Sequence, residues 1–436
     1  MKRYLIPTLL VFTAGQLLAS DQIPAPAQNR PIAITGATIY PVSGPAISDG
    51  VIVFDKGKIT AVGKEVQIPS GATTIDARGK RVYPGLITAY SNIGLTEVGS
   101  VRGTNDINET GRINPNVRAE VSVNPESEII PVTRANGIAT ALVAPGGGTI
   151  AGRSAFMMLD GWTWEDMVLK APVAMHVSWP RKTLARAWWM QQSEEEQRAE
   201  REKSQVALRS AFDDARAYMV AREADRARWV SRHKSDLRWD AMIPVFKREL
   251  PVIVEADEIQ QIEAAVAWAD RENLRLIIWG GLDAWRVAEL LKSRDIPVIV
   301  QGTHRQPSRR FDAYDDPFTL PAKLHEAGIR FCMAGGDASN ERNLPYQAAT
   351  AAAYGLPKEE ALKSITLYPA QILGVADRIG SLEAGKDATL IITDGDPLEI
   401  PTQIERMFIQ GRDVDLTSRH TVLYEKYKTK YGRRSP

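Results

Sequence analysis

The chain of 436 residues has a single cysteine and only five histidines, so each of these side chains can be weighed individually. The lone Cys332 excludes an intrachain disulfide framework but does not argue against an oxidising compartment. A formal net charge of +1 gives no electrostatic reason to expect a nucleic-acid partner. Beyond residue 20 no apolar run is long and pure enough for a transmembrane helix, so we expect no membrane span in the mature chain.

The first 20 residues differ in character from the rest of the chain. Lys2 and Arg3 precede a mostly apolar run from Leu5 to Ala14, and small residues follow. This pattern is typical of a secretory signal peptide, since the run is too short to cross a bilayer. We therefore expect a signal peptide over residues 1–20, a linker over 21–30, and a protein that is exported, either periplasmic or secreted.

The mature chain begins with β segments and continues with alternating β and helical patterns. Residues 31–82 contain short β segments separated by turns, which predicts a small sheet. From residue 83 to residue 378, buried-type β segments alternate with helical patterns. Seven candidate strands are Leu86–Tyr90, Ile138–Val143, Pro172–Val177, Pro251–Glu255, Leu274–Trp279, Pro297–Gln301 and Ile329–Ala334. We predict an α/β fold with a (β/α)₈ barrel, its eighth strand lying between Ala155 and Leu169.

Two further segments complete the predicted organisation. Residues 191–240 are rich in charge, with apolar residues at three- and four-residue spacing, which predicts a helical insertion on the barrel. Residues 379–415 return to strand character. Because a barrel brings the two flanking segments together, we expect these strands to join residues 31–82 in a composite β-sandwich. Residues 416–436 form a C-terminal tail.

Five short stretches, in this order and spacing, give the chain a family resemblance. They are Asp55–Gly63, Ile75–Lys80, Pro84–Ile87, Ala334–Ala338 and Gly380–Leu390. Through them the sequence resembles the amidohydrolase superfamily, most nearly its imidazolonepropionase-like branch. The resemblance implies a TIM-like barrel with a composite β-sandwich, and hydrolysis of a carbon–nitrogen bond in an amide, cyclic amide or dipeptide.

The resemblance also implies a metal centre from which this sequence departs. Members of the family hold one or two divalent, zinc-like ions with a His-x-His pair, further histidines and a final aspartate. Here the His-x-His positions carry Tyr90 and Asn92, and Glu255 stands where a histidine is expected. No histidine ends the strand at Ile278–Gly281. Asp337 alone occupies its expected place, where the resemblance implies a general base.

The remaining polar residues at strand ends allow several readings. His176 and His304 follow two predicted strands, and strand ends of a barrel converge on one face. Together with Glu255 and Asp337 they could form a rebuilt metal site. They could instead donate hydrogen bonds to loop carbonyls, while Asp337 and Glu255 share acid and base roles without metal.

Three residues are candidates for binding substrate. Tyr90 and Asn92 could bind a substrate carbonyl or carboxylate, or fill the volume that the metal leaves. Arg102 lies in the polar stretch 97–124 after the first barrel strand, and an arginine there could bind a carboxylate bidentately.

Two functions from different classes follow. The first is an exported hydrolase of a small-molecule substrate with a carbon–nitrogen bond, with Asp337 and Glu255 as catalytic groups and one divalent metal or none. The alternative is a catalytically inactive paralogue that serves as a ligand-binding or partner scaffold. In either case we expect a homo-oligomer or a pairing with a related amidohydrolase as candidate assemblies.

Overall fold

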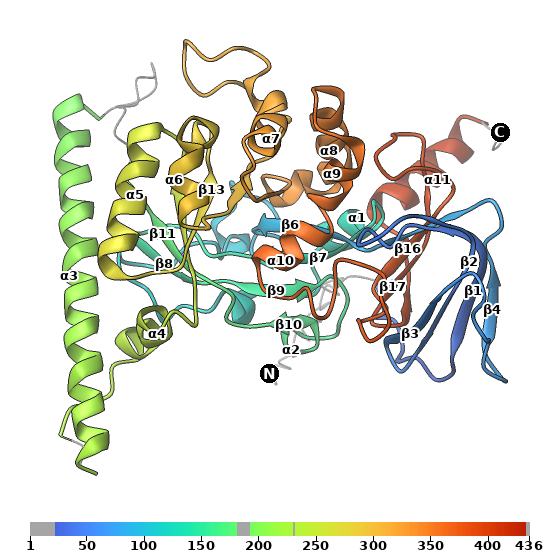
Figure 1. Ribbon diagram of the computed structural model, residues 1–436, viewed down its shortest axis with the longest axis horizontal. Coiled ribbons are helices and arrows are strands. Elements are labelled where there is room, and N and C mark those ends of the chain that lie inside the picture. The colour runs from blue at the N-terminus through green and yellow to red at the C-terminus, as the bar shows by residue number, and fades with distance from the viewer. Residues whose placement is uncertain (1–21, 181–191, 230–231, 433–436) are drawn as a thin grey trace, which may run out of the picture.

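The computed structural model describes residues 22–180, 192–229 and 232–432, so the predicted signal peptide lies outside the described residues. The molecule is elongated, with a β-sheet region at one end, a mixed α/β body in the middle and a long helix at the opposite end (Figure 1). Within the described ranges no helix combines the length and the apolar character that a membrane crossing requires.

The two ends of the chain share one eight-stranded sheet. Its strands are β1 (Ile32–Ile39), β2 (Ile47–Asp55), β3 (Lys58–Gly63), β4 (Thr73–Asp76), β5 (Arg81–Pro84), β16 (Leu390–Thr393), β17 (Ile404–Ile409) and β18 (Arg412–Val414). Antiparallel pairing of β5 with β16 joins the two halves, and the rings of Phe54 and Phe408 meet across them at 5.1 Å. Residues 31–82 and 379–415 therefore build one sheet. A second sheet packed face to face, which a sandwich requires, stays a prediction.

The body contains the seven predicted strands, each within three residues of its expected bounds. They are β6 (Leu86–Ser91), β7 (Ile138–Val143), β11 (Met175–Ser178), β12 (Val252–Ala256), β13 (Leu276–Gly280), β14 (Val298–Val300) and β15 (Phe331–Met333). The pairs β6–β7 and β11 to β15 in succession are parallel. A bond from the Gly335 amide to the Thr88 hydroxyl, at 3.3 Å, links the end of β15 to β6.

The eighth strand differs from the expectation in its direction. A strand does begin at Ala155, but β9 (Ala155–Met158) runs antiparallel to β7, and β10 (Val168–Lys170) runs antiparallel to β9. Before it, β8 (Ile150–Arg153) pairs antiparallel with β11. The segment between β7 and β9 contains β8 and no helix, and that between β9 and β10 is also short, so neither provides the long helical crossover that a parallel neighbour needs. This part of the chain therefore departs from regular β–α alternation.

Helices surround these strands. They are α1 (Ile129–Arg134), α2 (Trp164–Met167), α3 (Glu194–Ala227), α4 (Leu237–Phe246), α5 (Ile259–Glu272), α6 (Ala288–Ser293), α7 (Asp316–Glu326), α8 (Leu344–Ala353), α9 (Lys358–Lys363), α10 (Leu367–Ile372) and α11 (Arg419–Lys430), with short 3₁₀ turns η1 (Arg102–Thr104), η2 (Ala119–Ser122), η3 (Ala284–Val287) and η4 (Ala338–Asn343). Most of the C-terminal tail is thus the helix α11.

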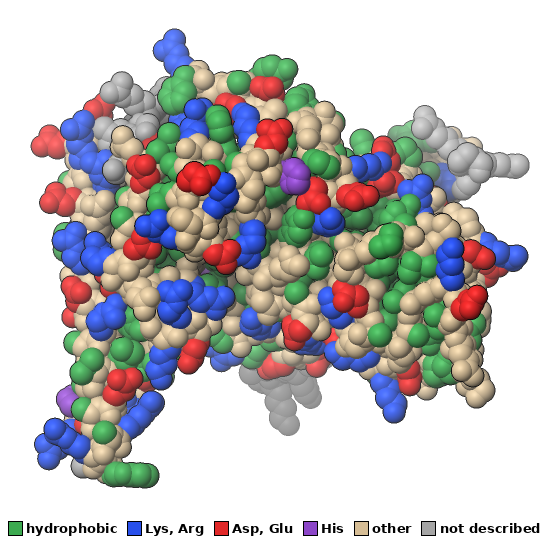
Figure 2. Space-filling model, viewed as in Figure 1, with side chains coloured by type: hydrophobic (Ala, Val, Ile, Leu, Met, Phe, Trp, Pro, Cys, Tyr) green, Lys and Arg blue, Asp and Glu red, His purple; other side chains and the backbone are tan. Residues whose placement is uncertain are grey.

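The predicted helical insertion is the pair α3 and α4. Ser193 begins α3 with a capping box, in which its hydroxyl accepts from the Glu196 amide and the Glu196 carboxylate accepts from the Ser193 amide. Of the predicted apolar stripe, Leu208, Phe212 and Ala215 are buried, whereas Tyr218 and Met219 are partly exposed. The ring of Phe212 lies 5.0 Å from that of Trp268 on α5. The outer face mixes acidic and basic side chains along its length (Figure 2), as a solvated helix surface does.

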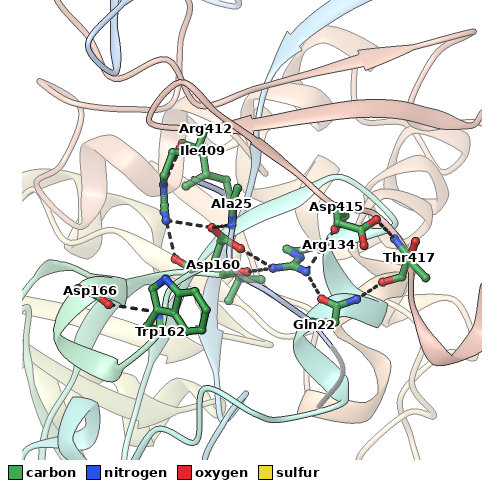
Figure 3. Close-up of polar contacts among 11 residues, drawn as sticks. Gln22, Ala25, Arg134, Asp160, Trp162, Asp166, Ile409, Arg412, Asp415 and Thr417 are labelled. Atoms are coloured by element: carbon green, nitrogen blue, oxygen red, sulfur yellow. Dashed lines mark hydrogen bonds and ion pairs between the residues drawn. The ribbon is translucent and has the colours of Figure 1, made fainter. Parts of the chain in front are cut away.

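A buried ion-pair cluster fastens both chain ends to the body (Figure 3). Asp160 accepts from the Arg134 guanidinium at 3.0 Å and pairs with Arg412, from β18, at 2.9 Å. Its carboxylate also accepts from the amide of Ala25 at 3.3 Å, so the linker segment is held against the body. Burial raises the pKa of Asp160, while its two arginine partners oppose the rise.

Asp160→Asn should lower the free energy of unfolding by about 3–5 kcal/mol, because two buried guanidinium groups lose their counter-charge. Chemical denaturation followed by circular dichroism measures the change. Asp76→Asn is the matched control, since Asp76 pairs with Arg78 on the open surface and its loss should leave the midpoint unchanged. Equal midpoints for all three proteins would show that the cluster adds no stability.

Candidate functional site

A cleft of about 540 Å³ opens where β6, β13, β14 and β15 end. It is lined by Tyr90, Trp279, Gln301, Gly302, His304, Arg305, Gly335, Gly336, Asp337, Asn340, Asn343 and Gln347. The carboxyl ends of parallel strands are the usual place for a ligand site in such folds. Of the seven predicted site residues, Tyr90, His304 and Asp337 line this cleft.

Tyr90 is the centre of an aromatic cluster at the base of the cleft. Its ring stacks on Trp279 with centroids 4.0 Å apart and planes 10° apart, and the edge of His176 meets it at 5.5 Å. Burial raises the pKa of Tyr90 above its ordinary value, and the charge of Glu255 adds to the rise. The phenol therefore stays protonated, and its ring fills space between β6, β11 and β13.

Asn92 is committed to a structural hydrogen bond. Its side-chain oxygen accepts from the amide of Ala338 at 2.9 Å, which ties the end of β6 to the first turn of η4. An amide oxygen engaged in this way supports the loop that carries Asp337. The second position of the expected His-x-His pair thus has a supporting role.

Asp337 is exposed at the cleft wall and begins η4. One carboxylate oxygen accepts from the Asn340 side-chain amide at 3.0 Å. The carboxylate is therefore available to a ligand in the cleft. Asp337 is held by a flexible side chain, whereas Asn92 is held by a backbone amide.

The two histidines expected at strand ends lie in contrasting environments: His304 follows β14, whereas His176 lies within β11, two residues before its end. His176 is buried, its Nε2 has no hydrogen-bond partner among the described residues, and burial lowers its pKa to about 3. His304 is exposed and its Nε2 lies 2.8 Å from the Thr350 hydroxyl, while partial burial lowers its pKa. His176 is thus a neutral packing residue beside Tyr90, and His304 is a cleft-wall residue.

Glu255 and Arg102 complete the predicted set. Glu255 ends β12, opposite Trp279 in register, and its charge reaches Tyr90. Arg102 is exposed on η1, outside the set of residues that line the cleft.

The predicted metal set does not fit a metal ion. In the part of the chain that the structure describes, no three His, Cys, Asp or Glu side chains are grouped as ligands. Tyr90 is packed between rings, Asn92 holds a backbone amide, and His176 is sealed among apolar side chains. The structure therefore does not bring His176, His304, Glu255 and Asp337 together as a ligand set.

A buried carboxyl that the sequence did not reveal lies beneath the cleft. Glu341 on η4 has no exposed surface, and burial raises its pKa to about 8, with the charge of Asp337 adding to the rise. The Thr88 and Ser91 hydroxyls and the Gly335 amide are close enough to oppose the rise, although neither carboxyl oxygen forms a hydrogen bond of good geometry within the described chain. The group is thus mainly protonated at neutral pH.

Two cleft residues could have been found from their positions. Arg305 directly follows His304, and Trp279 ends a predicted strand, so the convergence of strand ends applies to both. Glu341 gave no comparable signal, because it lies beyond the strand in a 3₁₀ turn whose path the sequence does not specify.

With this geometry described, the chain can be compared with known proteins. Residues 317–417 match the amidohydrolase family. This segment contains Asp337, Glu341 and the strands β16 and β17. A curated protein, amidohydrolase tasK of Hapsidospora irregularis, is 23% identical over 88% of this chain, which spans only 43% of that protein.

Solved structures support the same fold. An amidohydrolase from Thermotoga maritima MSB8 superposes with a TM-score of 0.78 at 26% identity, covering 88% of this chain and 99% of that one. A zinc-bound adenosine deaminase from Xanthomonas campestris (TM-score 0.51, 16% identity, 93% and 99% covered) and a Xaa-Pro dipeptidase with bound methionine (0.55, 14%, 88% and 100%) share the fold alone. The chain thus carries an amidohydrolase-family segment in a mixed α/β fold with amidohydrolase structural neighbours.

Glu341→Gln should flatten the dependence of stability on pH. A glutamate whose pKa is raised from 4.5 to about 8 by folding stabilises the protein fully below pH 4.5, and this contribution is lost as the pH rises towards 8. We expect the unfolding midpoint of the wild type to fall between those two values by more than that of Glu341→Gln. Parallel denaturation at both ends of the range measures this. Glu359→Gln, on the exposed surface of α9, should behave as the wild type, and identical slopes for all three would contradict the assignment.

Proposed function

We propose that this protein binds a small polar molecule in the cleft and does not carry out the metal-assisted hydrolysis of a zinc-bound member of this fold. The proposal rests on the structural contacts that the side chains of Tyr90 and Asn92 already make. One is stacked on Trp279 and the other holds the Ala338 amide. Restoring a metal pair at these positions would require both contacts to be given up.

The cleft retains the features of a ligand site. It is concave, it has an aromatic wall at Trp279, and the side chains of Gln301, Asn340 and Asn343 present polar groups. Pockets that combine apolar surface with a few placed polar groups are the usual form of small-molecule sites. A ligand-binding role therefore accounts for the cleft without requiring an ion.

A second candidate is hydrolysis of a carbon–nitrogen bond, and the position of Asp337 favours it. Its carboxylate faces the cleft from the place where a proton-accepting group would meet an attacking water. The relatives are named as amidohydrolase, dipeptidase and deaminase, which are enzymes of that reaction class. In this alternative Asp337 takes the proton of the water. The substrate is then an amide, cyclic amide or dipeptide, as the resemblance to the imidazolonepropionase-like branch implies.

Export and assembly belong to the same proposal. The pattern of residues 1–20 supports a periplasmic or secreted protein, which sequencing the N-terminus of the mature protein would test. We also propose a homo-oligomer or a pairing with a related amidohydrolase, and light scattering with and without such a partner would detect either assembly.

The deciding experiment combines metal analysis with an amide and dipeptide hydrolysis screen on the purified chain. We expect no stoichiometric metal, no turnover above the buffer rate, and ligands that raise the melting temperature. Turnover that a chelator abolishes would overturn the proposal. Turnover that survives the chelator but disappears in Asp337→Asn would establish the second candidate instead. Glu359→Gln serves as the folded control, since Glu359 is exposed on α9 and lies outside the cleft lining.

A further inference from the structure

The wall of the cleft contains a buried arginine without a counter-charge. Arg305 follows β14 and lines the cleft, and its Nη1 donates to the Gln301 side-chain oxygen at 3.3 Å. Its Nε and Nη2 are shielded from solvent and have no hydrogen-bond partner among the described residues. Burial lowers the pKa of Arg305, and the more distant charges of Asp257 and Asp312 only partly oppose this. Buried guanidinium groups are normally paired, so the arrangement is costly as it stands.

A second arginine of the same loop, Arg309, does form ion pairs. Arg309 lies four residues further on and is also largely buried, yet it pairs with Asp283 at 2.6 Å and with Asp312 at 2.8 Å. Asp312 is therefore already occupied by Arg309 and leaves Arg305 without a direct partner of its own. The contrast indicates that a group from outside the described chain completes Arg305.

The free edge of Arg305 has a defined shape. Nε and Nη2 lie along one edge of the planar guanidinium, where an N–H bond of each runs parallel to the other, while Nη1 is turned to Gln301. Two parallel donors match the two oxygens of one carboxylate. Both nitrogens are shielded in the structure, so a ligand in the cleft that Arg305 lines would meet this edge only after rotation about the outer side-chain torsions.

We propose that the ligand of the cleft carries a carboxylate and that Arg305 binds it through its Nε–Nη2 edge. This rests on the cleft being a ligand site. A carboxylate fits better than a phosphate, since the charges of Asp257 and Asp312 reach Arg305 and repel a dianion more strongly than a monoanion. The Trp279 ring and the side chains of Asn340 and Asn343 then meet the uncharged part of the molecule.

The test uses a panel of N-acetyl amino acids, each matched with its C-terminal amide, and measures binding by calorimetry to the full mature chain. We expect at least one carboxylate to bind and its amide to bind about 10- to 100-fold more weakly, since a charge-assisted pair is lost. Arg305→Gln should weaken the carboxylate by a similar factor and leave the amide unchanged. Phenyl phosphate is the competing anion and should not bind more tightly than the carboxylates.

Arg310→Gln is the matched control, because Arg310 is an exposed arginine of the same loop. It should bind as the wild type does. Arg305→Lys keeps the charge but lacks the fork, and should fall between the wild type and Arg305→Gln. The melting temperature of each variant verifies folding, and that of Arg305→Gln should not fall, since an unpaired cation is removed.

The outcomes separate the two proposals. If no member of the panel binds at about 1 mM, the assignment of Arg305 to a carboxylate fails. The ligand cleft is then decided by the melting temperatures of the broader screen, and it fails too if no ligand raises them. If carboxylate and amide bind equally, or Arg305→Gln retains the full preference for the carboxylate, the assignment of Arg305 is overturned while the ligand cleft stands. Tighter binding of phenyl phosphate than of every carboxylate would also overturn it.

Discussion

The passage from the sheet to the body depends on close packing at one glycine. Gly85 separates β5 from β6, and its amide donates to the carbonyl of Thr389 beside β16. A Cβ at this position would lie 2.6 Å from that of Ala139 on β7. Only a glycine lets the chain pass between these neighbours, and the passage sets where β6 begins. The direction of β6 then fixes the places of Tyr90 and Asn92, and with them the base of the cleft.

At the base of the cleft, packing and a hydrogen bond join the ends of separate strands. A divalent ion organises several strand ends at once, because each ligand side chain points at a common centre. Here the stack of Tyr90 on Trp279 links β6 to β13, and the bond from Ala338 to Asn92 links β6 to η4. Two local contacts thus hold these strand ends together without a shared ion, and they leave the outer part of the cleft to a ligand.

The sequence predicted the elements better than their directions or side-chain environments. All seven strands were found because buried parallel strands have continuous apolar runs, as in Val252–Ala256. The antiparallel course of β9 was missed, since strand direction depends on long-range pairing that a short apolar run does not encode. His304 follows β14 as expected, whereas His176 was expected to end its strand and instead lies within β11; only the structure shows that His176 is buried beside Tyr90 and His304 exposed. The burial and orientation of a side chain depend on tertiary packing, which a local sequence pattern does not specify.

The most informative groups in the site are therefore the buried polar ones that packing leaves incomplete. Folded proteins give nearly all their buried polar atoms a hydrogen-bond partner. A buried polar atom without a partner in the wall of a cleft is therefore more informative than an exposed one, which water can satisfy. Glu341 lacks well-formed hydrogen bonds to the residues that the structure describes, but its raised pKa keeps the carboxyl protonated and so removes its charge. A guanidinium cannot follow that route, because it stays protonated at any ordinary pH. Arg305 keeps its charge in the wall, and an anionic partner is what its environment lacks.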